Sequence, residues 1–198
     1  MAKSHKGNET GGRINQLLGN ETALRADGTR VLHVIQGEHK VSDDPNVVLT
    51  TILGSCVAAC MCDPVAKIGG LNHFLLPDNG NRNSLEMRYG LLAMELLING
   101  LLKRGANRNR LEAKLFGGAN MNSRLGHIGA SNSNFALRFL QDEGIPCLSS
   151  SLGGNQARRI RYTPTTGSAQ QRLLSNEDSI VPKETPPNPP KCDDVILF

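Results

Sequence analysis

The sequence contains no tryptophan, and aromatic residues make up only 4% of its 198 residues. A protein that binds single-stranded nucleic acid by base stacking needs several aromatic side chains in a row, so this class is excluded. An excess of charge of one sign is also missing, because 22 basic residues are balanced by 18 acidic ones and the net charge is +4. A protein that binds duplex DNA usually carries a marked excess of positive charge, which this chain does not have.

Long hydrophobic runs are absent as well. The first 21 residues contain no apolar segment like that of a secretory signal, and the longest apolar stretch, residues 91–102, is interrupted by Glu95 and Asn99. The cysteines are few and odd in number, unlike the disulfide framework of a small secreted protein: Cys56, Cys60, Cys62, Cys147 and Cys192. We therefore expect a soluble cytoplasmic protein whose thiols stay reduced.

Composition divides the chain into one central domain and two tails. Residues 1–28 are rich in Gly, Asn, Lys and Arg, and residues 169–198 contain five prolines between positions 182 and 190. Segments of this kind bury too little apolar surface to fold, so we expect both tails to be disordered. The apolar residues 195–198 are either an ordinary chain end or a docking peptide. The folded domain should span residues 29–168, a usual size for a single domain.

Hydrophobic periodicity within this domain predicts strands, a helix, a strand, a second helix and final strands. Strands are expected at 30–36, 47–52, 56–62, 68–76, 111–116, 147–151 and 158–163, and helices at 85–104 and 133–143. The run at 56–62 is almost continuously apolar, which is typical of a strand buried on both faces, although a short buried helix also fits. The first helix should bury a stripe of large residues: Leu85, Tyr89, Leu92, Leu96 and Ile98. This order of elements favours a single-domain, mixed α/β layered sandwich.

The residues that point to chemistry begin with a cysteine in a glycine-containing turn. The expected strand at 47–52 runs into Gly54, Ser55 and Cys56, where a thiol can act as a nucleophile and turn amides can face an oxyanion. His73 follows in a later apolar run, and pairing of the two runs as neighbouring strands would bring it close to Cys56. An imidazole beside a thiol can take its proton. The alternatives are an inert packing cysteine and a satisfied core histidine.

The same cysteines allow a second interpretation. Cys56, Cys60 and Cys62 share strand parity and could form a Cys/His metal site with His73. The spacing does not match a zinc knuckle, and the outer thiols lie too far apart along a strand for easy tetrahedral closure. We therefore expect no metal, and we assign Cys60 and Cys62 to core packing.

The run LTTILGSCVAACMCDPVAKIGGLNHFLLP, at residues 49–77, resembles the signature of the CheD family of bacterial chemoreceptor glutamine deamidases. The segment KLFGGANM, at residues 114–121, and several shorter segments up to residue 167 follow in the order of that family. The resemblance covers roughly residues 30–168. One departure is Ser131, where the family often has an arginine.

This resemblance implies a layered α/β sandwich related to the catalytic domains of deamidating bacterial toxins, and a Cys-His hydrolase that needs no cofactor. Position by position, it makes Cys56 the nucleophile, His73 the general base and Thr50 the polar residue that orients the imidazole. Thr51 is the adjacent alternative, but strand parity sends it to the opposite face. The backbone amides of Ser55 and Cys56 would hold the oxyanion.

The resemblance also implies the reaction, which is conversion of specific glutamines of methyl-accepting chemoreceptors to glutamate with release of ammonia, in chemotaxis adaptation. The expected partners are chemoreceptor cytoplasmic domains and a CheC-like phosphatase, with neither nucleic-acid binding nor membrane insertion. The alternative function is a non-enzymatic regulatory module that docks such a phosphatase, and a third is a metal-binding structural domain. The Cys-His pair favours the enzyme, because a pure adaptor need not keep it.

Overall fold

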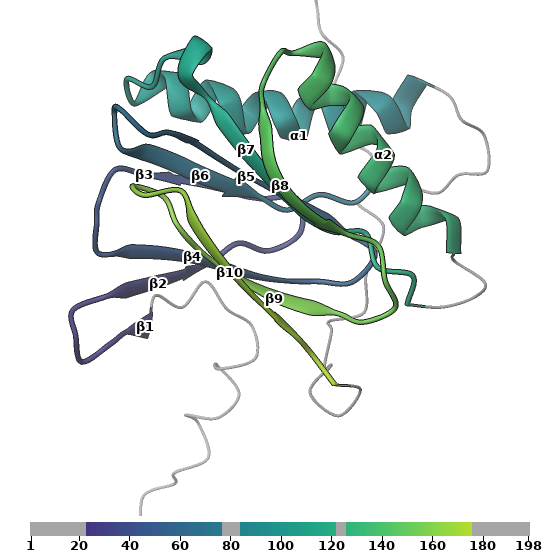
Figure 1. Ribbon diagram of the computed structural model, residues 1–198, viewed down its shortest axis with the longest axis horizontal. Helices are drawn as coiled ribbons and strands as arrows, with labels where there is room; N and C mark the ends of the chain where they lie inside the picture. Colours follow the sequence, from purple (N-terminus) through teal and green to yellow (C-terminus); the bar gives the residue numbers. More distant parts are fainter. Residues whose placement is uncertain (1–22, 77–83, 122–125, 176–198) are drawn as a thin grey trace, which may run out of the picture.

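The computed structural model describes residues 23–76, 84–121 and 126–175, which form a mixed α/β domain in three layers (Figure 1). The elements in chain order are β1 (Ala23–Leu24), β2 (Arg30–His33), β3 (His39–Ser42), β4 (Val47–Leu53), β5 (Val57–Asp63), β6 (Ile68–Asn72), α1 (Ser84–Lys103), the 3-10 helix η1 (Arg108–Arg110), β7 (Glu112–Gly117), α2 (Gly126–Asp142), β8 (Cys147–Leu152), β9 (Arg158–Thr163) and β10 (Ser168–Leu173). Sheet A has the strand order β1-β2-β4-β9-β10, and sheet B has the order β3-β6-β5-β7-β8. Both helices cover the face of sheet B that points away from sheet A (Figure 1). The expected layered sandwich is therefore confirmed.

β5 is the middle strand of sheet B and is buried along its whole length. Val57, Ala59 and Met61 pack in the core beneath the helices, whereas Ala58 and Cys60 pack in the core between the two sheets. Successive side chains of a strand point to opposite faces, so one continuous apolar run can serve two cores. The expectation of a strand buried on both faces is confirmed, and the alternative of a short helix is wrong.

Two strands extend the domain beyond its expected boundaries. β10 continues the fold to residue 173, although the tail was expected to begin at 169, and β1 lies within the expected N-terminal arm. β10 is mostly exposed and polar, and it is held by antiparallel pairing with β9 rather than by an apolar face. A strand of this kind carries no hydrophobic alternation that a sequence pattern could reveal. Residues 1–22 and 176–198, the rest of both tails, lie outside the described residues.

The buried side of α1 differs from the expected stripe. The residues that pack on sheet B are Met94, Leu97, Ile98 and Leu101. Of the expected stripe, Ile98 is therefore buried and Tyr89 packs against the same core. Leu92 and Leu96 are instead 56% and 42% exposed, and the side chain of Leu85 lies outside the described residues. The helix carries apolar residues on nearly all sides, so periodicity alone does not identify the face that meets the sheet. Neither helix of the described residues is long and apolar enough to cross a membrane.

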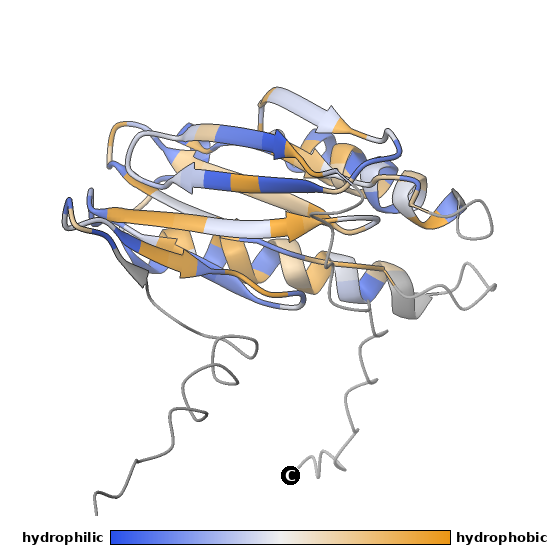
Figure 2. Cartoon of the chain, turned by 90° about the horizontal axis from the view of Figure 1, so that it is seen from below, coloured by the Kyte–Doolittle hydropathy of each residue, from blue (hydrophilic) through white to orange (hydrophobic). Residues whose placement is uncertain are grey.

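Sheet A covers the inner face of sheet B and closes the second core. Figure 2 views the molecule from the sheet A side and shows hydrophobic stretches alternating with hydrophilic ones along its strands. β4 is the middle strand, with β2 parallel to it on one side and β9 antiparallel on the other. Leu49 and Leu53 of β4 belong to the core between the sheets, so residues of odd number in this strand face sheet B.

Candidate active site

Cys56 lies where the chain crosses from one sheet to the other. β4 ends in sheet A and β5 begins in sheet B, so residues 54–56 form the connection between the two layers. The Cys56 side chain is only 2% exposed and belongs to the core between the sheets. A short connection between two packed layers fixes the position of this thiol far better than a surface loop would.

The backbone of this turn is held through its carbonyl groups. Each of the three oxygens accepts a hydrogen bond: Gly54 from the Ala119 amide (2.8 Å), Ser55 from Nδ2 of Asn132 (3.1 Å) and Cys56 from the Gly118 amide (2.7 Å). In a trans peptide the C=O and the next N–H point in opposite directions. The N–H groups of Ser55 and Cys56 therefore point away from Ala119 and Asn132, the partners of the carbonyl groups before them.

The loop that supports the turn depends on glycine at two positions. A Cβ atom on Gly117 would lie 2.1 Å from the carbonyl oxygen of Cys56, and the φ of Gly117 is +116°. A Cβ on Gly118 would lie 2.0 Å from Oγ of Ser133, and its φ is +62°. Both positions combine a left-handed backbone with a contact that leaves no room for a side chain. The loop can therefore approach the turn at residues 54–56 closely only because these residues are glycines.

Cys56 comes directly before β5 and His73 directly after β6, so the two residues lie at the same end of neighbouring strands. β6 pairs antiparallel with β5, and the bridge between Val57 and Phe74 extends this pairing in the same register. His73 is then opposite Ala58, two residues from Cys56, so the thiol and the imidazole are diagonal neighbours on the face that sheet A covers. The expected pairing of the two runs is confirmed, and it brings His73 beside Cys56.

The imidazole of His73 is held from sheet A by Thr51. Oγ1 of Thr51 lies 2.8 Å from Nδ1 of His73, and the carbonyl oxygen of Val34 lies 3.4 Å from the same nitrogen. Thr51 is buried between Leu49 and Leu53 on the inner face of β4. These contacts engage Nδ1 and fix the orientation of the ring.

Thr50, which was expected to orient the imidazole, points to the other face of β4. Its Oγ1 donates a hydrogen bond of 2.7 Å to the carbonyl oxygen of Ile160 in β9. The two threonines do lie on opposite faces, as strand parity requires, but the one that the CheD resemblance made the orienting residue faces away from His73. β4 ends before Cys56, and the intervening turn breaks the alternation. The structure therefore places Thr51, the adjacent alternative, at the ring.

Asn132 connects the turn at residues 54–56 to the segment after His73. Its residue type alone did not mark it as a site residue. It is fully buried on α2, where its Oδ1 accepts from the Leu76 amide at 2.7 Å and its Nδ2 donates to the Ser55 carbonyl at 3.1 Å. One side-chain amide thus holds both the turn before the thiol and the segment after His73. The one available signal is an asparagine inside a helix, a position that this residue type disfavours. Ser131, the departure from the CheD pattern, is exposed beside it.

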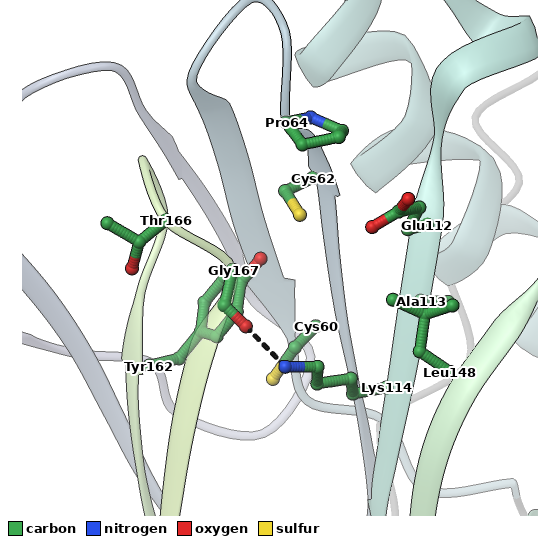
Figure 3. A pocket seen from close by; sticks show the side chains of 10 residues that line it. All are labelled: Cys60, Cys62, Pro64, Glu112, Ala113, Lys114, Leu148, Tyr162, Thr166 and Gly167. Atoms are coloured by element: carbon green, nitrogen blue, oxygen red, sulfur yellow. Dashed lines mark hydrogen bonds between the residues drawn. The ribbon is translucent and has the colours of Figure 1, made fainter.

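Cys60 and Cys62 line a cavity whose lining includes neither Cys56 nor His73. The cavity measures about 130 Å³ and lies between β5, β7 and the β9–β10 turn, where Nζ of Lys114 donates to the Gly167 carbonyl at 2.8 Å (Figure 3). Burial raises the pKa of the Cys60 thiol well above its usual range and also raises the pKa of Cys62. A higher pKa lowers the thiolate fraction, so both are poor nucleophiles. In the part of the chain that the structure describes, no three His, Cys, Asp or Glu side chains gather as metal ligands.

Comparison with known proteins points to one family. The family model described as CheD chemotactic sensory transduction matches residues 75–173, a segment that begins just after His73 and ends with β10. Proteins named probable chemoreceptor glutamine deamidase CheD match most of the chain. The relative from Cereibacter sphaeroides is 52% identical, and the match covers 84% of this chain and 84% of the relative. The relative from Caulobacter vibrioides is 56% identical, with 84% of this chain and 92% of the relative covered. The relative from Agrobacterium fabrum is 54% identical, with 88% of this chain and 99% of the relative covered.

Similarity to solved structures is weaker. A crystal structure of the hypothetical protein YfiH of Bacillus licheniformis matches 57% of this chain and 49% of its own length, with a TM-score of 0.39 and 15% identity. A crystal structure of a Neisseria meningitidis protein matches 65% of this chain and 64% of its own length, with a TM-score of 0.39 and 13% identity. At this level neither structure indicates a function for the chain.

Proposed function

This chain belongs to the CheD family, and from that premise we propose that it hydrolyses glutamine side-chain amides of methyl-accepting chemoreceptors to glutamate, with Cys56 as the nucleophile. The observation that carries this function is the position of Cys56 and His73 as diagonal neighbours at one end of the paired strands β5 and β6, with Thr51 at Nδ1 of the imidazole. The product glutamates would serve as methyl-accepting sites in chemotaxis adaptation. The reaction consumes one water and releases ammonia, and it needs no cofactor.

The first half of the reaction forms a thioester. The carbonyl of Val34 can only accept a hydrogen bond, which favours a proton on Nδ1 of His73 and leaves Nε2 as the basic nitrogen. Nε2 takes the proton of Cys56, and the thiolate attacks the amide carbon of the glutamine. The negative charge that develops on the amide oxygen is stabilised by the backbone amides of Ser55 and Cys56. His73 then returns the proton to the amide nitrogen, and ammonia leaves.

The second half hydrolyses the thioester. Ammonia has left room beside His73, and Nε2 takes a proton from a water molecule that attacks the thioester carbon. The second tetrahedral intermediate uses the same amides of Ser55 and Cys56. When it collapses, the bond between the carbon and Sγ breaks, and His73 protonates the departing thiolate. The free enzyme and the glutamate product remain.

Incubation of the full chain with chemoreceptor cytoplasmic fragments tests this function. Peptide mass spectrometry scores conversion of glutamine to glutamate, and a coupled assay measures ammonia. We expect both products in equal amounts. A chain that binds a CheC-like phosphatase but converts no glutamine in any fragment would instead support the binding-module alternative.

The two threonines offer a matched pair of variants for the mechanism. Thr51→Val keeps the shape of the side chain but removes the hydroxyl at Nδ1, so kcat should fall about fivefold, the equivalent of one hydrogen bond of about 1 kcal/mol. Thr50→Val removes a buried hydroxyl that serves only the Ile160 carbonyl, so it should lower stability by about 1 kcal/mol and leave kcat unchanged. Steady-state kinetics and urea denaturation of both variants provide the measurement. If Thr50→Val were inactive and Thr51→Val active, Thr50 rather than Thr51 would be the residue that orients the His73 imidazole.

A further inference from the structure

The side chain of Gln36 lies against the nucleophile. Sγ of Cys56 is 3.5 Å from Oε1 of Gln36, and the thiol donates to the amide oxygen. Gln36 belongs to the connection between β2 and β3, is half-buried, and comes from a part of the sequence without a catalytic motif.

The segment that carries Gln36 is fixed to the backbone of His73. The Gly37 amide donates to the His73 carbonyl at 2.7 Å, and the His73 amide donates to the Glu38 carbonyl at 3.0 Å. Within the segment, the Glu38 amide donates to the Ile35 carbonyl at 3.0 Å, and Gly37 takes a φ of +86°, which favours glycine. The turn therefore brackets the general base and holds Gln36 in a set position relative to both His73 and Cys56.

The side-chain amide of Gln36 can act as a hydrogen-bond acceptor before Cys56 loses its proton and as a donor afterwards. In the resting site its oxygen accepts from the thiol of Cys56. Once the thiol has lost its proton, an amide oxygen beside a thiolate is repelled, whereas the Nε2–H group of Gln36 is attracted. A half-turn about the last side-chain bond exchanges the two atoms without moving the rest of the residue. The glutamine thus turns from an acceptor into a donor at the moment when negative charge appears.

We propose that Gln36 is a further catalytic residue, whose Nε2–H donates to the oxyanion formed when Cys56 attacks the substrate amide. The oxyanion is bonded to the carbon that Sγ attacks, so it forms within reach of a group that already contacts Sγ. Side-chain amides are effective donors in such sites, and the backbone contacts of Gly37 and Glu38 to His73 fix the segment that carries this one. This role presupposes the deamidation proposed above, and it adds a side-chain donor to the backbone amides of Ser55 and Cys56.

The test separates formation of the thiolate from stabilisation of the oxyanion. Alkylation of Cys56 by iodoacetamide needs the thiolate but forms no oxyanion, whereas deamidation needs both. In the full chain, Gln36→Met keeps the length of the side chain and removes the amide. We expect kcat for a chemoreceptor fragment to fall about 10²-fold, with KM little changed. The pH midpoint of Cys56 alkylation, followed by peptide mass spectrometry, should stay where it is in the parent chain.

Control samples complete the experiment. Gln171→Leu, on the exposed edge strand β10, is the matched control and should keep full activity. Gln36→Ala replaces Gln36→Met if that variant fails to fold. The parent chain and Cys56→Ser are also compared for the mass of the peptide that contains Gln36.

Each other outcome overturns this role for Gln36. An unchanged kcat in Gln36→Met removes Gln36 from the reaction. A loss of kcat together with a displaced alkylation midpoint means that Gln36 acts on His73 or the thiolate instead. Conversion of Gln36 to glutamate in the parent but not in Cys56→Ser would make it an internal substrate. If the parent chain itself converts no receptor glutamine, the proposed function fails first, and the role of Gln36 fails with it.

Discussion

A Cys56→Ser variant should fold like the parent chain and lose at least about 10³-fold in glutamine deamidation, because removal of a covalent nucleophile has effects of this size in other hydrolases. Serine and cysteine have nearly the same shape, so the packing between the sheets is kept. A hydroxyl is much harder to deprotonate than a thiol, and the imidazole of His73 cannot activate it to the same degree. The rate is measured by peptide mass spectrometry of a receptor fragment, and folding by circular dichroism.

Cys60→Ser and Cys62→Ser are the controls for this variant. Both thiols lie on β5 beyond the site, and burial raises their pKa values. We expect both to keep the deamidation rate, and Cys60→Ser to lose about 1–2 kcal/mol of stability, since it places a hydroxyl in an apolar core. Full activity in Cys56→Ser would make the nucleophile assignment wrong. Loss of activity in all three variants, reproduced by a chelator, would point to a metal site.

Removal of the imidazole should have the second largest effect. His73→Ala eliminates the general base and acid, so deamidation should fall by roughly 10²- to 10⁴-fold. The pH profile of Cys56 alkylation should also move to higher pH, because the imidazolium no longer stabilises the thiolate. The pH at the midpoint of this profile reports ionisation of the Cys56 thiol. A change in access to the buried thiol would alter only the maximum rate of alkylation.

His127→Ala is the control for this variant, because His127 is exposed on α2. It should leave both the deamidation rate and the alkylation profile unchanged. An alkylation profile of His73→Ala that coincides with that of the parent would remove His73 from the activation of Cys56. If His127→Ala lost as much deamidation activity as His73→Ala, the cause would be a general loss of stability, which urea denaturation would reveal.

The sequence predicts those parts of the fold that depend on buried apolar patterns. β5 and β9 lie within a residue or two of their expected bounds, because their buried positions carry most of the periodicity. β10 could not be predicted, because a polar edge strand is held by backbone hydrogen bonds to β9. The buried side of α1 was also ambiguous, since Leu92 and Leu96 are as apolar as the residues that face the sheet.

Some features of the site can likewise be predicted from the sequence, and others cannot. The approach of His73 to Cys56 follows from antiparallel pairing of two adjacent apolar runs, a local arrangement that the sequence can indicate. The choice between Thr50 and Thr51 depends on how the turn after β4 leaves the strand, which no residue pattern encodes. Gln36 reaches the thiol from a separate loop, and tertiary packing alone creates that contact.

The central claim is that this chain hydrolyses glutamine side chains in chemoreceptors through a thioester at Cys56. The most direct measurement is incubation of the full chain with a receptor cytoplasmic fragment in water enriched in ¹⁸O, followed by peptide mass spectrometry. Hydrolysis through a thioester places one oxygen of the solvent in each new glutamate, so we expect the heavy isotope at specific glutamines with the parent chain and none with Cys56→Ser. Receptor glutamines that remain unlabelled with the parent chain, or that are labelled equally with Cys56→Ser, would contradict this account.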